Sequence, residues 1–269
     1  MSPVLKLVAT DLDGTLLGTG GVVTDRTRDV LDRLDARGVT VVFVTGRPIR
    51  WMDDLWEHVG GHGIAICSNG GIVYDVSSHS VIEARCIPPK LGLEVAELIR
   101  AEVPGTMFAL EKTTGFGKEP EFLPAPEDAD RPELDIGPLD TVFSDNVVKL
   151  LALHPDQEPA AFWAIVEETV GHLVTTTWSA IGPLVEMSAA GVTKASTLEL
   201  FCAERGIGAH EVVAFGDMPN DIPMLQWAGT SYAMENGHES TKAAATHIAP
   251  KHDQDGVARV LEELFGLPT

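Results

Sequence analysis

The sequence lacks the residues that stabilise small secreted scaffolds and those that bind nucleic acid. Its three cysteines, Cys67, Cys86 and Cys202, are far apart and form no CxxC pair, so we expect reduced thiols in a cytoplasmic protein. Lysine and arginine number only 19 against 40 acidic residues, which gives a formal charge of −21. Such a field repels nucleic acid and acidic membrane surfaces, so neither is expected as a partner. An anionic substrate would therefore need local cations or a metal ion.

Long apolar runs are also absent. No stretch approaches the roughly 20 residues that cross a bilayer. The first residues lack the basic segment followed by an apolar stretch that is typical of secretory signals, so we expect none. Aromatic residues are only 6% of the chain, whereas apolar residues together make up 44% of its 269 residues. That composition is sufficient for one large domain or two smaller ones with buried cores.

Short apolar segments alternate with amphipathic ones at both ends of the chain. Helical patterns follow the capping residue Thr24, run from Pro48 to about Val59, and resume over 195–205. Segments that are apolar on both faces are typical of buried parallel strands. The predicted strands of this kind are 5–10, 39–44, 64–67 and 212–215, with further short ones at 231–234 and 248 before a last helix over 256–265. The fold class is therefore predicted to be α/β, with a parallel sheet between helical layers in a Rossmann-like core.

The pattern changes between about residues 85 and 187, where a helix followed by strands occurs twice. The elements predicted there are a helix over 89–103, strands over 106–112, 121–123 and 147–153, a helix over 158–170, and strands over 173–179 and 184–187. The Pro- and Asp-rich segment 124–138 has no apolar period and predicts an exposed loop. We therefore expect a discontinuous core domain, residues 1–84 and 188–269, interrupted by an inserted α+β domain, residues 85–187.

Carboxylates gather where the first predicted strand ends, in Asp11-Leu12-Asp13-Gly14-Thr15-Leu16. Ligands of open α/β sheets bind at the carboxyl ends of the strands. A turn at Gly14 would let Asp11 point at a substrate while Asp13 lies beside it. A buried unpaired carboxylate is costly, so a neighbouring cation is expected. The alternative is an Asp-rich structural turn.

A second group of carboxylates, in Gly216-Asp217-Met218-Pro219-Asn220-Asp221, follows the predicted strand 212–215. If this strand is next to the first one, Asp11, Asp13 and Asp217 converge and can supply hard oxygen ligands to Mg²⁺. Taken alone, the segment could simply be a turn that caps the next helix.

Two further positions can neutralise or hold an anion. Thr45-Gly46-Arg47 follows the second predicted strand, where a hydroxyl and backbone N–H groups can cradle a phosphate. Lys194 begins a predicted helix and is a candidate to pair with Asp11 and a phosphoryl group. An isolated lysine is more often a solvated surface charge, and a strand-to-helix turn is often only structural.

These elements, in this order, resemble the motifs of the haloacid dehalogenase superfamily of phosphatases. Asp11-Leu12-Asp13-Gly14-Thr15-Leu16 is similar to the first motif, Thr45-Gly46 to the second, Lys194 to the third and the 216–221 segment to the fourth. The form of the fourth motif and the position of the insertion resemble the Cof-type branch, class IIB. Further matches to that branch are Ser68-Asn69-Gly70-Gly71 and Asp255-Gly256-Val257-Ala258.

The resemblance implies a Rossmann-like core, a cap formed by the insertion, and a role for each matched residue. Asp11 would be the nucleophile that forms an aspartyl-phosphate, and Asp13 the general acid and base. Mg²⁺ would be held by the side chains of Asp11 and Asp217 and by the backbone carbonyl of Asp13. Phosphate binding is implied for Thr45, Gly46, Lys194 and Asn220, with Asp221 and Asn69 in supporting positions.

The function expected from this resemblance is Mg²⁺-dependent hydrolysis of small phosphorylated metabolites, such as sugar phosphates, with specificity set by the cap. Related pump-type ATPases carry threonine where this chain has Asp13, and a carboxylate there favours prompt turnover. One alternative is a phosphomutase, which needs a bisphosphorylated activator. Another is a non-catalytic metabolite-binding protein on the same fold. Net phosphate release distinguishes these possibilities.

Overall fold

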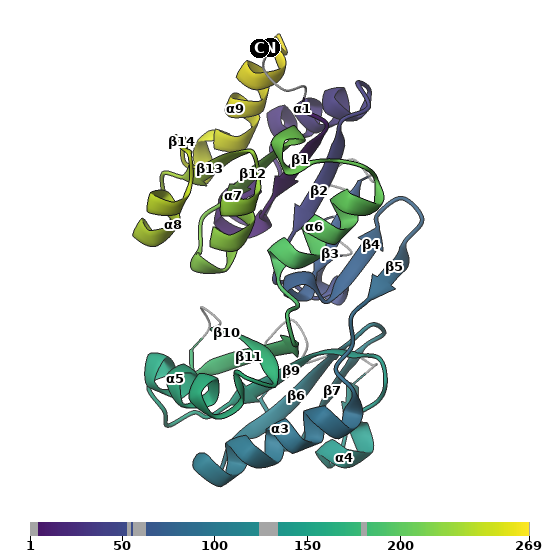
Figure 1. Cartoon of the computed structure of the whole chain (residues 1–269), viewed down its shortest axis with the longest axis vertical. Coiled ribbons are helices and arrows are strands. Elements are labelled where there is room, and N and C mark those ends of the chain that lie inside the picture. Colours follow the sequence, from purple (N-terminus) through teal and green to yellow (C-terminus); the bar gives the residue numbers. More distant parts are fainter. Residues whose placement is uncertain (1–4, 53–54, 56–62, 124–133, 179–181, 269) are drawn as a thin grey trace. The chain divides into compact units, whose positions relative to one another are not determined.

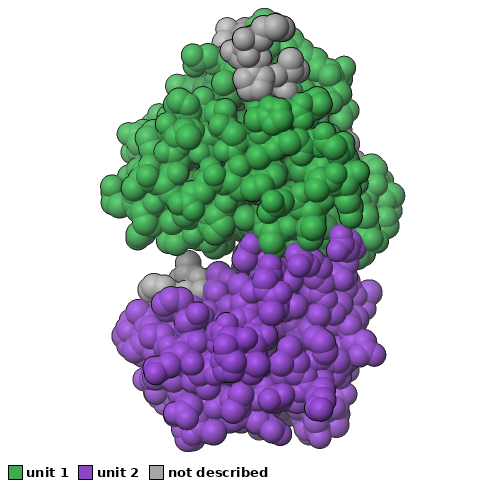
Figure 2. Space-filling view, in the orientation of Figure 1, with its two compact units in different colours: residues 1–47, 51–82, 194–269 green, residues 48–50, 83–193 purple. Residues whose placement is uncertain are grey.

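The computed structural model describes residues 5–52, 55, 63–123, 134–178 and 182–268, and the chain divides into two compact units (Figures 1 and 2). Residues 1–47, 51–82 and 194–269 form one unit, called here the core unit; residues 48–50 and 83–193 form the other, called the inserted unit. The chain therefore crosses between the units after residues 47, 50, 82 and 193. None of the helices in the described residues combines the length and apolarity needed to cross a membrane.

The core unit contains an eight-stranded sheet with the order β14-β13-β12-β1-β2-β3-β4-β5. Its strands are β1 (Leu7–Thr10), β2 (Thr40–Val44), β3 (Ile64–Cys67), β4 (Ile72–Asp75), β5 (Ser80–Ala84), β12 (Val212–Gly216), β13 (Thr230–Met234) and β14 (His247–Ala249). The six strands from β14 to β3 pair in parallel, and β4 pairs with β3 in antiparallel fashion. The predicted strands are thus confirmed. Side chains of the central strands β1, β2 and β12 are buried on both faces of the sheet as the apolar pattern indicated, whereas Ile248 of the edge strand β14 is exposed.

Helices cover both faces of the core sheet, which confirms the predicted three-layer α/β class. The helices are α1 (Asp25–Asp35), α6 (Lys194–Glu204), α7 (Ile222–Trp227), α8 (Glu239–Ala244) and α9 (Gly256–Phe265). Side chains of α6 and α7 form one apolar cluster with strand residues, and α1 and α9 pack together on the other side (Figure 1). As predicted, Thr24 caps α1, because its side-chain oxygen accepts a hydrogen bond from the backbone N–H of Thr27.

The helix predicted from Pro48 falls largely outside the described residues. Within the described part, the chain forms a short 3₁₀ helix, Ile49–Trp51, and Leu55 is also helical. Three elements in the described part of the core unit were not predicted, namely the neighbouring strands β4 and β5 and the short helix α8.

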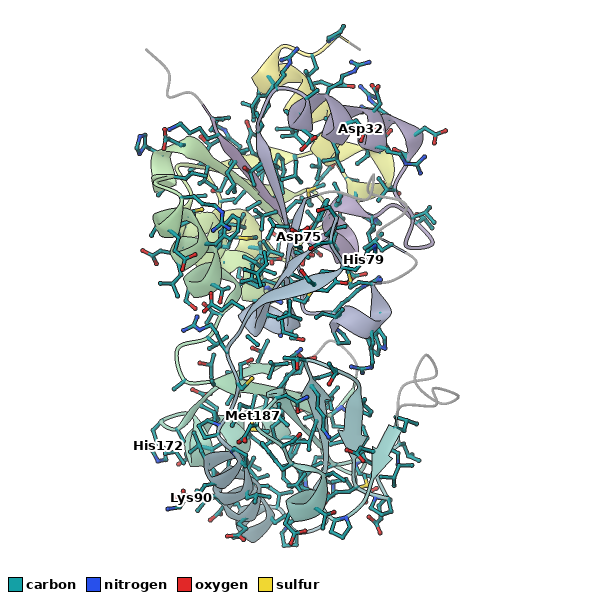
Figure 3. The ribbon with its side chains drawn as sticks, turned by 90° about the vertical axis from the view of Figure 1, so that its right-hand side faces the viewer. Asp32, Asp75, His79, Lys90, His172 and Met187 are labelled. Carbon is teal, nitrogen blue, oxygen red and sulfur yellow. The ribbon has the colours of Figure 1, made fainter. Side chains whose placement is uncertain are left out.

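The inserted unit is a six-stranded sheet with the order β10-β11-β9-β6-β7-β8, antiparallel except for the parallel pair β7–β8. Its elements are α3 (Pro89–Glu102), β6 (Met107–Lys112), β7 (Phe116–Lys118), β8 (Leu134–Ile136), α4 (Leu139–Val142), β9 (Val147–Leu153), α5 (Pro159–Val170), β10 (Val174–Trp178) and β11 (Leu184–Ala189). Helices α3 and α5 pack on one face, where Met187 is buried, whereas Lys90 of α3 lies at the surface (Figure 3). This arrangement confirms the predicted α+β insertion.

Two predictions for the inserted unit are wrong. Residues 121–123 form no strand; the strand is β7, five residues earlier. The ammonium group of Lys118 donates hydrogen bonds to the carbonyls of Glu119, Pro120 and Phe122, which holds this segment as a turn. The predicted loop over 124–138 contains β8 at its end, while residues 124–133 lie outside the described part of the chain.

Candidate active site

The first and fourth motifs lie next to each other because β1 and β12 are neighbouring parallel strands. Thr10 at the end of β1 pairs with Phe215 of β12, and the backbone N–H of Asp11 donates to the carbonyl of Phe215 over 3.0 Å. The carboxyl ends of both strands therefore meet at one edge of the sheet, as predicted. Asp11 and Asp217 follow these two strand ends directly and are both buried.

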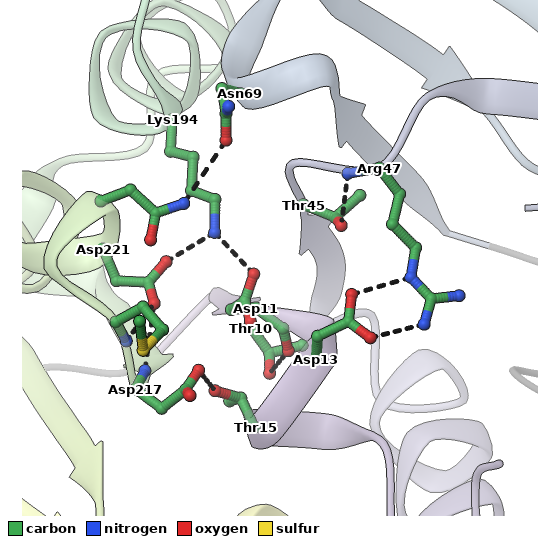
Figure 4. Close-up of polar contacts among 12 residues, drawn as sticks. Thr10, Asp11, Asp13, Thr15, Thr45, Arg47, Asn69, Lys194, Asp217 and Asp221 are labelled. Atoms are coloured by element: carbon green, nitrogen blue, oxygen red, sulfur yellow. Dashed lines mark hydrogen bonds and ion pairs between the residues drawn. The ribbon is translucent and has the colours of Figure 1, made fainter. Parts of the chain in front are cut away.

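Lys194, the first residue of α6, joins two buried carboxylates. Its Nζ donates to Asp11 Oδ1 over 2.6 Å and to Asp221 Oδ1 over 2.7 Å (Figure 4). Burial raises the pKa of Asp11 well above its ordinary value; the positive charge of Lys194 opposes this rise, and the negative charge of Asp221 adds to it. Burial alone would lower the pKa of Lys194, but the charges of Asp11 and Asp221 outweigh it and raise that pKa. Lys194 is therefore held as a buried cation.

Asp221 closes the turn that carries the fourth motif. Its Oδ2 accepts hydrogen bonds from the backbone N–H groups of Asp217 and Met218, each over 3.0 Å. Gly216 permits this close approach, because a Cβ there would lie 2.5 Å from the Cβ of Asp221. Since Oδ1 faces Lys194, both carboxylate oxygens of Asp221 have partners within the protein. The side chain is thus placed to orient Lys194 and the backbone of Asp217.

Asp217 sits against the turn of the first motif. Its Oδ1 accepts a hydrogen bond from the hydroxyl of Thr15 over 2.9 Å. Its Oδ2 packs against Gly14, where a Cβ would lie only 2.4 Å away and where φ is +75°. Burial, with the negative charge of Asp221, raises the pKa of Asp217 to about 6. The carboxyl group is therefore short of positive charge in the protein alone.

The carboxylates fit a divalent cation. Asp11, Asp217 and Asp221 each offer an oxygen, and these atoms lie within 4.8 Å of one another. Such hard oxygen donors suit Mg²⁺. Asp221 is already engaged by Lys194 and two backbone N–H groups, whereas Asp11 Oδ2 accepts no hydrogen bond from the described residues. Asp11 and Asp217 are therefore the better donors.

Asp13 contributes no side-chain oxygen to this cluster. Its Oδ2 and Oδ1 instead accept hydrogen bonds from Nε and Nη2 of Arg47, over 2.7 and 2.5 Å (Figure 4). The backbone turns between Asp13 and Gly14, with φ and ψ of −74° and 121° at Asp13. Arg47 was visible beside the second motif in the sequence, but nothing there indicated that its guanidinium reaches Asp13.

Thr45 and Gly46 follow β2 and contact the loop that follows β3. The hydroxyl oxygen of Thr45 accepts from the N–H of Arg47, and the Thr45 carbonyl accepts from the N–H of Asn69, both over 3.0 Å. A Cβ on Gly46 would lie 3.0 Å from Asn69 Oδ1. That same oxygen accepts a longer hydrogen bond, 3.4 Å, from the amide of Asn220. Asn69 thereby links the second and fourth motifs, and the residues that the sequence predicts for the site lie together at this edge of the sheet.

Comparison with known proteins agrees with this geometry. A family model described as haloacid dehalogenase-like hydrolase matches residues 8–261. The chain is 25% identical over 264 residues to the 5-amino-6-(5-phospho-D-ribitylamino)uracil phosphatase YitU of Bacillus subtilis (strain 168), covering 97% of this chain and 98% of that protein. It is 28% identical over 268 residues to the pyridoxal phosphate phosphatase YbhA of Escherichia coli (strain K12), covering 95% and 97%. A solved haloacid dehalogenase-like hydrolase from Bacteroides thetaiotaomicron superposes with a TM-score of 0.79 at 25% identity, covering 97% of this chain and all of that one.

Proposed function

The chain belongs to the haloacid dehalogenase-like hydrolases, and from that premise we propose that it is a Mg²⁺-dependent phosphatase acting on small phosphorylated metabolites through an aspartyl-phosphate. One observation carries the proposal: the buried carboxylate of Asp11 lies at a strand end, 2.6 Å from the ammonium of Lys194 and clustered with Asp217. The names of two relatives support the substrate class, since both are phosphatases of small phosphate esters.

In the first step, a carboxylate oxygen of Asp11 forms a bond to phosphorus. The bond between phosphorus and the leaving oxygen breaks, and its electron pair stays on that oxygen. Asp13, acting as general acid, gives its proton to the leaving oxygen, so an alcohol departs. The phosphoryl group remains on Asp11 as an acyl phosphate.

In the second step, the carboxylate of Asp13 takes a proton from a water molecule. The water oxygen forms a bond to phosphorus while the bond between phosphorus and the Asp11 oxygen breaks. Inorganic phosphate is released and the Asp11 carboxylate is restored. Asp13 is protonated again at the end of the cycle, so the two half-reactions balance.

The other residues bind and orient the reacting groups, because phosphoryl transfer depends mainly on positioning and charge neutralisation. Lys194 holds the Asp11 carboxylate in place and offsets negative charge. Thr45, Gly46 and Asn220 bind the phosphoryl oxygens, with Asn69 and Asp221 supporting them. The side chains of Asp11 and Asp217 and the backbone carbonyl of Asp13 would hold Mg²⁺, whose charge lets an anionic nucleophile approach an anionic ester.

The proposed cap is residues 85–187, which lie within the inserted unit. This cap sets which phosphate ester the enzyme accepts. Its fold differs from that of the core unit, and the proposed catalytic residues all belong to the core unit. A separate domain of this kind can vary while the site chemistry stays unchanged. Sugar phosphates and phosphorylated cofactors are the esters to test first.

The test measures phosphate release from a panel of small phosphate esters, with Mg²⁺ and with a chelator. Wild type is compared with Asp11→Asn and with Asp253→Asn, which alters an exposed aspartate of the core unit. We expect Mg²⁺-dependent turnover by wild type and the control, and a loss on the order of 10³-fold or more in Asp11→Asn.

Two results would contradict the proposal. Full activity of Asp11→Asn would show that Asp11 is not the nucleophile. If wild type released no phosphate from any ester, activated aryl phosphates included, the protein would instead be a phosphomutase or a non-catalytic metabolite-binding protein. The first of these two would turn over once a bisphosphorylated activator is added, and the second would not.

A further inference from the structure

The ion pair between Arg47 and Asp13 matches the planar fork of a guanidinium to both oxygens of a carboxylate. The Asp13 side chain is 57% exposed and that of Arg47 27%. An exposed pair contributes little to the free energy of folding. What the two hydrogen bonds provide instead is geometry, because they fix both the position and the plane of the Asp13 carboxyl group.

Arg47 presents its side chain from a backbone that is held on both sides. Its N–H donates to the hydroxyl of Thr45, and its carbonyl accepts from the N–H of Ser68, both over 3.0 Å. Pro48 follows and restricts the backbone of Arg47 to extended conformations. The guanidinium therefore extends toward Asp13 from the same loop that carries the second motif.

Asp13 depends on this partner. Within the part of the chain that the structure describes, no hydrogen bond other than those from Arg47 reaches its carboxyl group. An exposed aspartate without a partner samples several rotamers. A general acid, however, must stay within hydrogen-bond reach of the oxygen it protonates. Each carboxylate oxygen has a second lone pair, so binding Arg47 leaves room for a proton.

We propose that Arg47 is the positioning residue for Asp13, holding the carboxyl group where it protonates the leaving oxygen. This inference rests on the proposed phosphatase function and adds a residue to it. Arg47 acts through Asp13, and the phosphoryl group is bound by other residues.

The proposal makes the effect of Arg47 depend on the leaving group. An alkoxide leaves poorly without a proton, so alkyl esters require a well-placed acid. The para-nitrophenolate ion is stable and leaves without one. The ratio kcat/KM covers the steps up to departure of the leaving group, so later hydrolysis of the aspartyl-phosphate does not enter the comparison.

The experiment measures kcat/KM of Arg47→Met for two esters: para-nitrophenyl phosphate and the alkyl phosphate that wild type turns over fastest. We expect a loss of roughly 10- to 100-fold for the alkyl ester and of less than about threefold for the aryl ester. Arg33→Met is the matched control, since Arg33 forms a surface ion pair with Asp29 on α1; both of its ratios should stay at the wild-type values. A folding defect lowers kcat/KM for both esters by the same factor, so it cannot produce the predicted difference between them.

A double-mutant cycle tests whether Arg47 acts through Asp13. Asp13→Asn should show the same selectivity against the alkyl ester, and adding Arg47→Met to it should cause no further selective loss. An equal loss for both esters in Arg47→Met, or a further selective loss in the double variant, would overturn the inference. Weaker inhibition of Arg47→Met by inorganic phosphate would do so too, because it would make Arg47 a phosphate ligand. If wild type released no phosphate from either ester, the proposed function itself would have failed, which is a different outcome.

Discussion

The ammonium nitrogen of Lys194 lies 2.6 Å from Oδ1 of Asp11, although 183 positions separate the two residues along the chain. Lys194 is also the first residue after the chain leaves the inserted unit. The cation that offsets the negative charge of the proposed nucleophile therefore lies in the sequence directly after the inserted unit. Since Asp221 shares this cation, removing it would leave two buried carboxylates unpaired.

We predict that Lys194→Met lowers the free energy of unfolding by about 3–5 kcal/mol at neutral pH, because a buried charge without its partner is costly. The loss should be smaller at about pH 5 than at neutral pH, since the buried carboxyl of Asp11, whose pKa is raised by burial, becomes neutral as it takes up a proton in acid. Urea unfolding at both pH values measures this. Lys242→Met removes a surface pair with Glu239 and serves as the control. A loss that is the same at both pH values would contradict the explanation.

A second prediction concerns Asp217, whose charge has no cation of the protein in contact with it among the described residues. Because burial raises its pKa to about 6, the ionisation of Asp217 destabilises the metal-free protein progressively from about pH 4, near the unfolded pKa, and fully above about pH 6. Asp217→Asn should therefore raise the free energy of unfolding in a chelator by about 1–3 kcal/mol at neutral pH. The gain should vanish as the pH falls below about 4, where the wild-type carboxyl is protonated in both the folded and the unfolded chain.

Mg²⁺ should reverse the order of stability. Mg²⁺ should raise the free energy of unfolding of the wild type increasingly as its concentration exceeds the dissociation constant, and it should leave that of Asp217→Asn nearly unchanged. Thermal unfolding with and without Mg²⁺ reports both effects. If Mg²⁺ raised the melting temperature of the two proteins equally, Asp217 would not be a ligand of the metal.

Two glycines allow the contact at Asp217 to be separated from backbone strain. Gly14 and Gly20 both have positive φ, but a Cβ at Gly14 would meet Asp217 Oδ2 at 2.4 Å, whereas a Cβ at Gly20 would meet no atom within 4 Å. Gly20→Ala should cost about 1–2 kcal/mol of stability and leave the Mg²⁺ response intact. Gly14→Ala should also weaken Mg²⁺ binding by about 10-fold or more, because it would displace Asp217, a proposed ligand of the metal. Titration of the metal-induced shift in melting temperature distinguishes the two variants.

The core sheet was predictable because its physics is local and repetitive. Residues 39–44 are apolar on both faces of a strand, which only a strand covered on both sides tolerates. Since functional side chains gather at the carboxyl ends of such strands, the sequence predicts Asp11 and Asp217 at two strand ends. Their proximity depended on the two strands being neighbours, which the structure shows. Neither inference required any knowledge of side-chain direction.

The inserted unit and the partner of Asp13 were harder to predict for a different reason. Phe122 and Leu123 look like strand residues, but Phe122 is buried from a turn and Leu123 is 75% exposed. The turn is held by the ammonium of Lys118, which donates to nearby backbone carbonyls, and no periodicity of apolar residues reveals such a contact. The contact between Arg47 and Asp13 likewise depends on where a long side chain points across two loops.

The last prediction concerns the helical layer formed by α1 and α9. Arg26 of α1 binds Glu262 of α9 through both carboxylate oxygens, over 3.0 and 2.5 Å. The hydrogen bond and charge of Arg26 lower the pKa of Glu262 despite its burial. Glu262→Gln should therefore lower the free energy of unfolding at neutral pH, by about 1 kcal/mol because Arg26 is partly solvated.

A carboxyl whose pKa is lower in the folded chain stabilises the protein above its unfolded pKa, which is about 4.3 for glutamate. Below that value the contribution is lost as the pH falls through the folded pKa. The difference between wild type and Glu262→Gln should accordingly be constant from about pH 6 to 8 and close below about pH 4. Denaturant unfolding across this range measures it, with Glu199→Gln at an exposed position of α6 as the control. A difference that persists in acid would assign the effect of Glu262 to packing between the two helices, because packing does not depend on the ionisation of the carboxyl group.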